Sequence, residues 1–156
     1  MIGAAAAGLA GGASLLWAGG RAQAAAERFE ITLSDAEWRR RLTPQQYSVL
    51  RRAATERAGT SPLDREKRAG TFVCAGCALP LYSSRAKYDS GTGWPSFTRP
   101  LPNAVATRED DTLFMRRTEV HCRRCGGHLG HVFDDGPQPT GLRYCMNGDA
   151  MRFVPA

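Results

Sequence analysis

The chain has 156 residues and a formal net charge of +6. This length suits a single domain. With 42% hydrophobic and 23% charged residues, the composition excludes a multi-pass membrane protein, a coiled coil and a fully disordered chain. The 17 glycines and 9 prolines point to many turns and short strands rather than a helix bundle.

The first 20 residues carry no charged side chain and are rich in Ala and Gly. Ala22-Gln23-Ala24 then gives a small-x-small sequence, which is typical of the cleavage site of a bacterial export signal. We therefore expect an export signal over residues 1–24, a periplasmic location, and a single domain over residues 25–156. No Lys or Arg precedes the apolar run, so a start lost upstream stays open, as does an uncleaved membrane anchor formed by residues 1–20.

Residues 27–70 contain two helix starts and are expected to form a helical N-terminal segment. Ser34-Asp35-Ala36-Glu37 is a capping box that opens a short helix ending near Leu42. Thr43-Pro44-Gln45-Gln46 opens a second helix, with Pro in its first turn, and Gly59 is expected to end it.

Residues 71–156 change to a pattern of short strands separated by Gly and Pro. This region is expected to form a zinc-clamped β core, so the fold class is mainly β with N-terminal helices. The expected strands are residues 71–74, 111–121, 128–133, 143–147 and 151–154.

Four of the five cysteines form two C-x-x-C pairs, Cys74 with Cys77 and Cys122 with Cys125. A two-residue spacer lets both thiolates of one turn bind the same ion, and four thiolates complete a tetrahedral Zn²⁺ site of the structural type. We expect such a site to clamp two distant parts of the sheet. Two disulfides in an oxidising compartment, or a redox C-x-x-C motif, are the alternatives, although no βαβ pattern surrounds either pair.

The fifth cysteine, Cys145, is a candidate nucleophile. If residues 143–147 form a strand, Arg143, Cys145 and Asn147 share one face. A guanidinium beside a thiol is expected to lower the pKa of that thiol. A lone cysteine is more often a small buried hydrophobe, but a face of Arg, Cys and Asn is unusual for a core.

Two further segments supply candidate site residues. The segment His128-Leu129-Gly130-His131-Val132-Phe133 offers acid–base groups. On a strand, His131 and Phe133 share a face, whereas His128 points away or sits at the strand entry. The Gly-rich loop of residues 91–97 presents Trp94 and Phe97, which are suited to line a small apolar pocket.

Taken together, these motifs resemble the methionine-R-sulfoxide reductases of the B type. The matching stretches are residues 74–82, 88–97, 121–140 and 141–147. The resemblance implies a tent-like fold of two antiparallel sheets, with a structural Cys₄ zinc site opposite the active site. It implies thiol-dependent reduction of the R epimer of methionine sulfoxide in oxidised proteins or peptides.

The same resemblance implies roles for the candidate residues. Cys145 attacks the sulfoxide sulfur and becomes a sulfenic acid. His131 is the acid–base group and His128 supports it. Arg143 and Asn147 support Cys145 by charge and hydrogen bonds. Trp94 and Phe133 hold the substrate methyl group, which selects the R epimer, and Phe97 is a further substrate-binding residue that lines the pocket. Asp135 orients a histidine or a water.

The sequence departs from the family pattern at two positions. Many members have a second Cys in the Gly-x-Gly-Trp loop, where this chain has Thr92. We therefore expect regeneration by an external thiol donor, thioredoxin-like or other, with a zinc-binding cysteine or a residue lost with the N-terminus as the alternatives. Asp149 lies four residues after Cys145, and its carboxylate would oppose ionisation of the thiol if it faced the site.

Two rival functions remain open. One is a non-enzymatic zinc-binding module of the same tent-like fold, in which Cys145 is a core residue and Trp94 only packs. The other is a nucleic-acid zinc ribbon, which the net charge would permit. The expected export signal disfavours this second function, and the sequence shows no basic patch interleaved with aromatic residues, so we expect no binding to nucleic acid. A small β domain is expected to be a monomer.

Overall fold

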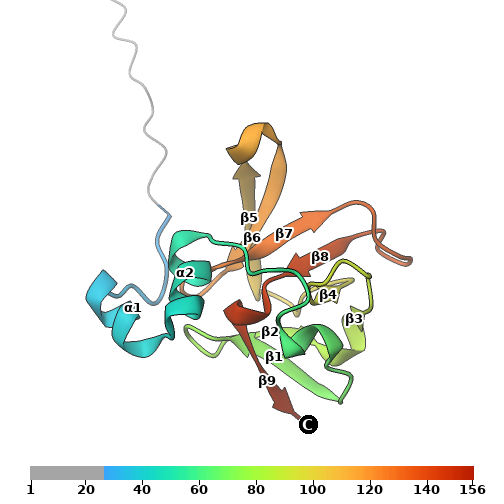
Figure 1. Ribbon diagram of the computed structural model, residues 1–156, viewed down its shortest axis with the longest axis horizontal. Helices are drawn as coiled ribbons and strands as arrows, with labels where there is room; N and C mark the ends of the chain where they lie inside the picture. Colours follow the sequence, from blue (N-terminus) through green and yellow to red (C-terminus); the bar gives the residue numbers. More distant parts are fainter. Residues whose placement is uncertain (1–26) are drawn as a thin grey trace, which may run out of the picture.

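The structure is a computed structural model that describes residues 27–156 (Figure 1). The expected export signal over residues 1–24 lies outside the described residues. Across residues 27–156, none of the helices has the length and apolar character needed to cross a membrane.

Both predicted helix starts are confirmed. Helix α1 spans Asp35–Arg41 and helix α2 spans Pro44–Arg52, and each begins with a complete capping box. The expected end of the second helix is wrong, because the chain leaves α2 at Ala53, which adopts a left-handed conformation with φ 53°. The rest of residues 27–70 is irregular apart from one 3-10 turn at Pro62–Arg65, so this segment is helical only in part.

The prediction of a mainly β fold with two antiparallel sheets is confirmed. A three-stranded sheet has the order β2-β1-β9, and a six-stranded sheet has the order β3-β4-β8-β7-β6-β5. The strands of the small sheet are β1 (Gly70–Cys74), β2 (Pro80–Ser83) and β9 (Met151–Pro155). Those of the large sheet are β3 (Lys87–Tyr88), β4 (Ser96–Phe97), β5 (Val105–Asp110), β6 (Arg117–Cys122), β7 (His128–Phe133) and β8 (Arg143–Met146).

The strand expected over residues 111–121 is wrong in its first half. Strand β6 starts only at Arg117, and the preceding residues form the turn of a hairpin with β5 that projects from the body of the molecule (Figure 1). The 3-10 turn Thr112–Phe114 interrupts the extended chain, because Leu113 and Phe114 both have positive φ, at 58° and 56°.

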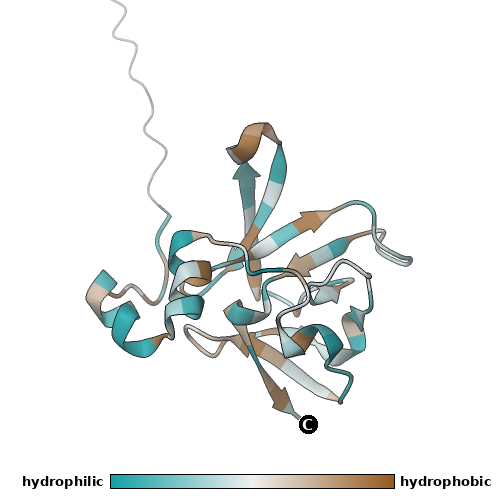
Figure 2. Ribbon diagram, viewed as in Figure 1, coloured by the Kyte–Doolittle hydropathy of each residue, from teal (hydrophilic) through white to brown (hydrophobic). Residues whose placement is uncertain are grey.

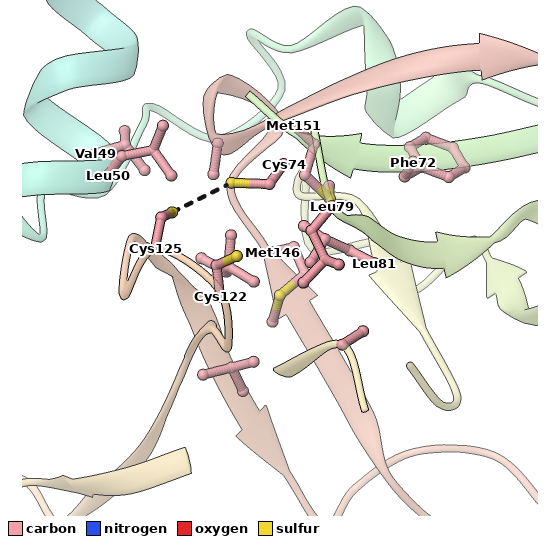
Figure 3. Packing of buried hydrophobic residues seen from close by; sticks show 14 of the residues in the cluster. Val49, Leu50, Phe72, Cys74, Leu79, Leu81, Cys122, Cys125, Met146 and Met151 are labelled. Atoms are coloured by element: carbon pink, nitrogen blue, oxygen red, sulfur yellow. Dashed lines mark hydrogen bonds between the residues drawn. The ribbon is translucent and has the colours of Figure 1, made fainter. Parts of the chain in front are cut away.

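The hydrophobic core lies between the two sheets and under helix α2. Figure 3 shows Val49 and Leu50 of α2 close to Cys74 and Cys125, and Phe72, Leu81 and Met146 further into the cluster. The outer faces of the helices are mostly hydrophilic (Figure 2). The core therefore holds together the helices, the small sheet and the strands that carry the candidate site.

The pairing of β8 with its two neighbours positions the candidate nucleophile. Cys145 lies opposite His131 of β7 on one side and opposite Ser96 of β4 on the other. Opposite residues in an antiparallel sheet project from the same face. Gly130 permits the close approach of β7 to β8, since a Cβ atom at this position would lie 2.1 Å from the carbonyl oxygen of Cys145.

We predict that Gly130→Ala forces β7 and β8 apart and lowers the free energy of unfolding by about 2 kcal/mol or more, because the clash is with backbone. Gly91→Ala is the matched control: its Cβ atom meets open space, and only its φ of 71° costs about 1 kcal/mol. Urea unfolding monitored by circular dichroism measures both. Equal losses in the two variants would contradict this account of Gly130.

Candidate active site and metal site

The four paired cysteines converge at one place. Their sulfur atoms all lie within 4.8 Å of one another, with Cys74 3.7 Å from Cys125 and Cys77 3.5 Å from Cys122. Sulfur atoms on a tetrahedron with metal bonds of about 2.3 Å are about 3.8 Å apart, so the cluster fits Zn²⁺. All five cysteines are free thiols, so neither predicted alternative with a disulfide is realised in this structure.

Each C-x-x-C pair sits in a tight turn that the backbone closes. The N–H of Ala78 donates to the carbonyl oxygen of Cys74, and the N–H of Gly126 donates to that of Cys122. Ala78 and Gly126 both have positive φ, at 60° and 71°. One turn follows β1 and the other joins β6 to β7, so a bound ion would link the small sheet to the large one.

Cys145 lines a small hollow of about 120 Å³. The hollow brings together residues from β6, β7 and β8, the Gly-rich loop and the chain after α2; they are Thr55, Trp94, Arg117, Gly130, His131, Phe133, Cys145, Met146 and Asn147. A hollow of about 730 Å³ lies elsewhere, but its lining contains no cysteine or histidine. The smaller hollow is therefore the candidate active site.

The thiol of Cys145 is half-buried, and burial raises its pKa. The Arg143 charge and a hydrogen bond with Thr92 oppose this effect without cancelling it. The expectation that Arg143 makes the thiol more acidic than usual is therefore wrong in its net direction, because desolvation of the thiolate outweighs the nearby charge. In the free protein, the thiol form of Cys145 predominates at neutral pH.

His131 lies opposite Cys145 in the pairing of β7 with β8, and a carboxylate forms a hydrogen bond with its ring. Its Nε2 atom lies 2.7 Å from Oδ2 of Asp110 on β5, which also accepts from Arg117 at 3.1 Å. Burial lowers the pKa of His131, and the hydrogen bond to Asp110 opposes that shift. Hydrogen bonds from Thr112 and His131 hold the pKa of Asp110 well below its usual value. Asp110 is thus ionised while His131 is mostly neutral at pH 7.

Of the two positions predicted for His128, the strand entry is confirmed, because β7 begins at this residue, and the ring does not point away from His131. A β-bulge in the pairing of β6 with β7 sets His128 opposite His121, although Gly130 stays opposite Val120. The ring of His128 therefore lies at an edge-on angle to that of His131, with centroids 5.5 Å apart. Its Nδ1 atom is 2.9 Å from a carboxylate oxygen of Glu119.

Glu119 itself is buried and paired with two side chains. Burial acts to raise the pKa of Glu119, but hydrogen bonds from His128 and Arg108 lower it to about 2. This ionised carboxylate fixes the orientation of the His128 ring. His128 is not in the lining of the hollow, so it meets the site only through its contact with the ring of His131.

Glu56, which the sequence analysis missed, holds three parts of the site together. Its backbone N–H donates to Oδ1 of Asn147 at 3.0 Å, and its carbonyl oxygen accepts from Nε1 of Trp94 at 3.1 Å. Its carboxylate accepts from the backbone N–H groups of Gly148 and Asp149. Burial raises the pKa of Glu56, and these two N–H groups oppose the rise. Glu56 therefore fixes both Trp94 and Asn147 at the edge of the hollow.

Two predicted substrate-binding residues lie elsewhere. Phe97 is fully buried in the core, where it stacks on Tyr82 with ring centroids 4.3 Å apart. It is opposite Tyr144 in the sheet, one position from Cys145, so it projects from the other face. The prediction that Phe97 lines the pocket is therefore wrong.

Asp135 forms no hydrogen bond with a histidine and does not line the hollow. Its carboxylate forms a two-pronged ion pair with Arg143, whose guanidinium lies 4.4 Å above the ring of Phe133. The carboxylates bound to histidines are those of Asp110 and Glu119 instead. Asp149 is not in the lining of the hollow, so the expected opposition to ionisation of Cys145 does not arise.

The remaining predicted residues meet at the hollow or beside it. Trp94, His131, Phe133, Cys145 and Asn147 all line it. Apart from Glu56, the residues that the sequence analysis missed are charged and lie on neighbouring strands, namely Asp110 on β5 and Arg117 and Glu119 on β6. One signal was present in the sequence: charged or titratable side chains at positions 117, 119 and 121 alternate with Thr118 and Val120, which marks one polar strand face.

Comparison with known proteins gives the family. A family model described as the SelR domain matches residues 42–155. The chain belongs to the SelR family. It is 50% identical over 126 residues to a peptide methionine sulfoxide reductase MsrB of Leptospira interrogans, an alignment that covers 80% of this chain and 96% of that protein.

Other relatives give the same result. The chain is 55% identical over 124 residues to a peptide methionine sulfoxide reductase MsrB of Thiobacillus denitrificans, covering 78% of this chain and 93% of that one. It is 53% identical over 127 residues to the protein of that name from Bradyrhizobium diazoefficiens, covering 81% and 91%. The predicted family and its enzyme class, an oxidoreductase, are confirmed for this SelR chain.

We predict that Arg143→Gln raises the pKa of Cys145 and slows its alkylation at pH 8 by about tenfold, because a nearby opposite charge shifts a pKa by about one or more. Iodoacetamide labelling over a range of pH, read by mass spectrometry of the Cys145 peptide, measures this. Arg99→Gln, which removes an exposed charge outside the hollow, is the control. An unchanged profile for Arg143→Gln would show that its charge does not act on the thiol.

Proposed function

We propose that this SelR chain reduces the R epimer of methionine sulfoxide in oxidised proteins and peptides back to methionine. The observation that carries the proposal is the juxtaposition of Cys145 with His131 across β7 and β8, in a hollow walled by Trp94 and Phe133. The names of the curated relatives support the substrate class.

In the proposed first step, the sulfur of Cys145 attacks the sulfoxide sulfur. The thiol proton passes to the neutral imidazole of His131, which returns it to the sulfoxide oxygen as that oxygen is transferred to Cys145. The products are methionine and the sulfenic acid of Cys145. The raised pKa of Cys145 and the lowered pKa of His131 support this proton relay, since both groups start in their neutral forms.

The proposed roles of the other residues follow from their contacts. Asp110 stabilises the imidazolium that forms at His131, because it is ionised and hydrogen-bonded to the ring. Trp94 and Phe133, which line the hollow with Cys145, contact the methyl group of the substrate and thereby select one epimer. Asn147, fixed by Glu56 and by the carbonyl oxygen of Leu129, presents a rigid polar wall.

We further propose that an external thiol regenerates Cys145. Thr92 lies beside Cys145, and the other four cysteines of the sequence belong to the metal cluster. A first thiol condenses with the sulfenic acid to give a mixed disulfide and water, and a second thiol releases Cys145 and forms the external disulfide. A thioredoxin-like protein or a small thiol can serve as this donor.

The family and the four-cysteine geometry support a structural zinc ion bound by Cys74, Cys77, Cys122 and Cys125. Zinc would supply folding energy rather than chemistry, because all four ligands come from the protein and no position is left for substrate. The ion would hold the turn before β7, and thereby His128 and His131, against the small sheet.

We predict that the protein, with dithiothreitol as reductant, reduces the R epimer of a methionine sulfoxide peptide and not the S epimer. Cys145→Ser is expected to abolish turnover while keeping the same thermal midpoint, because Cys145 is only half-buried. Chromatographic assay of each epimer separately measures the activity. Absence of turnover in the folded parent protein would favour the rival binding-module function.

We predict that Asp110→Asn lowers the pKa of His131 further, because it removes the carboxylate that favours the imidazolium. His131 must be neutral to accept a proton, so activity is lost as pH falls through its pKa. The acid limb of the pH profile of kcat/KM should therefore move to lower pH in Asp110→Asn, and the plateau should fall by about tenfold or more. Glu109→Gln on the same strand is the control. An acid limb that stays in place would exclude His131 as the group behind it.

We predict one zinc ion per chain, and loss of that ion in Cys77→Ser with a large fall in thermal midpoint. Cys145→Ser should retain the zinc, since Cys145 lies outside the cluster. Elemental analysis and circular dichroism measure the two quantities. A metal-free parent protein with two disulfides would contradict the zinc site.

A further inference from the structure

The turn of the hairpin formed by β5 and β6 is hydrophobic, as the brown ribbon at its end shows (Figure 2), and it contains three exposed apolar residues. Leu113 is 73% exposed, Phe114 is fully exposed and Met115 is 50% exposed. We call these three residues the hairpin tip. They account for three of the four large hydrophobic residues that are exposed within residues 27–156.

Neither packing nor backbone preference accounts for the two leading residues of the tip. Leu113 and Phe114 have φ of 58° and 56°, a left-handed conformation that costs residues with large side chains about 1–2 kcal/mol each. Gly or Asn would remove most of that cost and would also remove the exposed apolar surface. Side chains kept at a cost in free energy, and in contact with solvent, point to a binding role.

The hairpin tip is joined to the candidate active site through the base of the same hairpin. Asp110, which binds His131, accepts a hydrogen bond of 2.7 Å from the hydroxyl of Thr112, the residue before the tip. Arg117, which follows the tip by two residues, lines the hollow of Cys145. Two strand residues span about 7 Å, so Met115 lies within about 7 Å of Arg117 along the chain, which is the length of two residues of an extended peptide.

We propose that the hairpin tip binds apolar side chains two or three residues away from the methionine sulfoxide in an extended substrate chain. The inference rests on the proposed function and adds a sequence preference to it. A hollow of about 120 Å³ has room only for the oxidised side chain, so the flanking residues of a polypeptide must lie on the rim. Leu113 and Phe114 offer the apolar part of that rim.

Two other occupants fit the surface less well. A stable interface with a second copy takes about 20–30 residues on each side, whereas the tip has three. An anionic membrane is bound by unpaired basic side chains, whereas Arg116 and Arg117, which follow the tip, are paired with Asp111 and Asp110. An exposed apolar segment of an unfolded polypeptide meets neither obstacle.

The test compares the parent protein with the double variant Leu113→Asn and Phe114→Asn. Asn tolerates the left-handed conformation, so the variant should fold with an equal or higher thermal midpoint. The control is Val154→Thr, which removes an exposed apolar surface from β9 at another part of the molecule. Three substrates carry the R sulfoxide: an N-acetylated methionine amide, a peptide with Leu and Phe two and three residues from the sulfoxide, and the same peptide with Ser at those positions.

We expect the double variant to raise KM for the Leu–Phe peptide by about fivefold or more with kcat unchanged. The reason is that the lost apolar contacts stabilise the bound substrate and the transition state equally. Turnover of the amide and of the Ser peptide should stay within about twofold of the parent, and Val154→Thr should behave as the parent does. Equal KM values for the Leu–Phe peptide in parent and double variant would overturn the proposal while leaving the reductase function in place, since the amide reports that function separately. A concentration-dependent dimer that the double variant abolishes, with peptide kinetics unaltered, would likewise overturn it and assign the tip to a contact between copies.

Discussion

The backbone pairing of β7 with β8 is the constraint on which the candidate site depends. It sets Cys145 directly opposite His131, and Gly130 makes that approach possible because any side chain there would meet the carbonyl oxygen of Cys145. The same strand β7 begins at the turn that carries Cys125, so the metal cluster and the candidate active site share one structural element. Disturbing either end of β7 therefore acts on both.

Three carboxylates, two buried and one half-buried, then fix the polar side chains that this pairing brings together. Asp110 orients His131, Glu119 orients His128, and Glu56 connects the chain after α2 to the segment that follows Cys145. The pKa of Glu119 is lowered to about 2 because its histidine and arginine partners outweigh burial, so its charge persists throughout the physiological range. This arrangement leaves the thiol and the imidazole neutral beside charged groups, which suits the proposed reaction, because that reaction begins and ends with proton transfer.

Local signals in the sequence predicted the capping boxes of both helices, the two C-x-x-C turns and the strands that carry Cys145 and His131, because each depends on a few neighbouring residues. The pairing of strands that are distant in the sequence could not be predicted from these local signals. Phe97 appeared suited to the pocket, yet its place in the sheet turns it into the core, and the bulge near Leu129 reverses the expected direction of His128. Asp110 and Glu56 are far from Cys145 in the sequence, and only the strand order and the path of the chain after α2 reveal them.

The most direct test of this account is a single turnover in the absence of any thiol reductant. The parent protein would be mixed with one equivalent of a peptide bearing the R sulfoxide labelled with heavy oxygen, and then treated with a reagent that traps sulfenic acids. Mass spectrometry of the digested protein locates the trapped residue, and a matching sample left untrapped reports the fate of the label. The account predicts one equivalent of methionine and a sulfenic acid at Cys145 that carries the heavy oxygen. Release of methionine with Cys145 unmodified, or a label found on one of the four clustered cysteines, would contradict it.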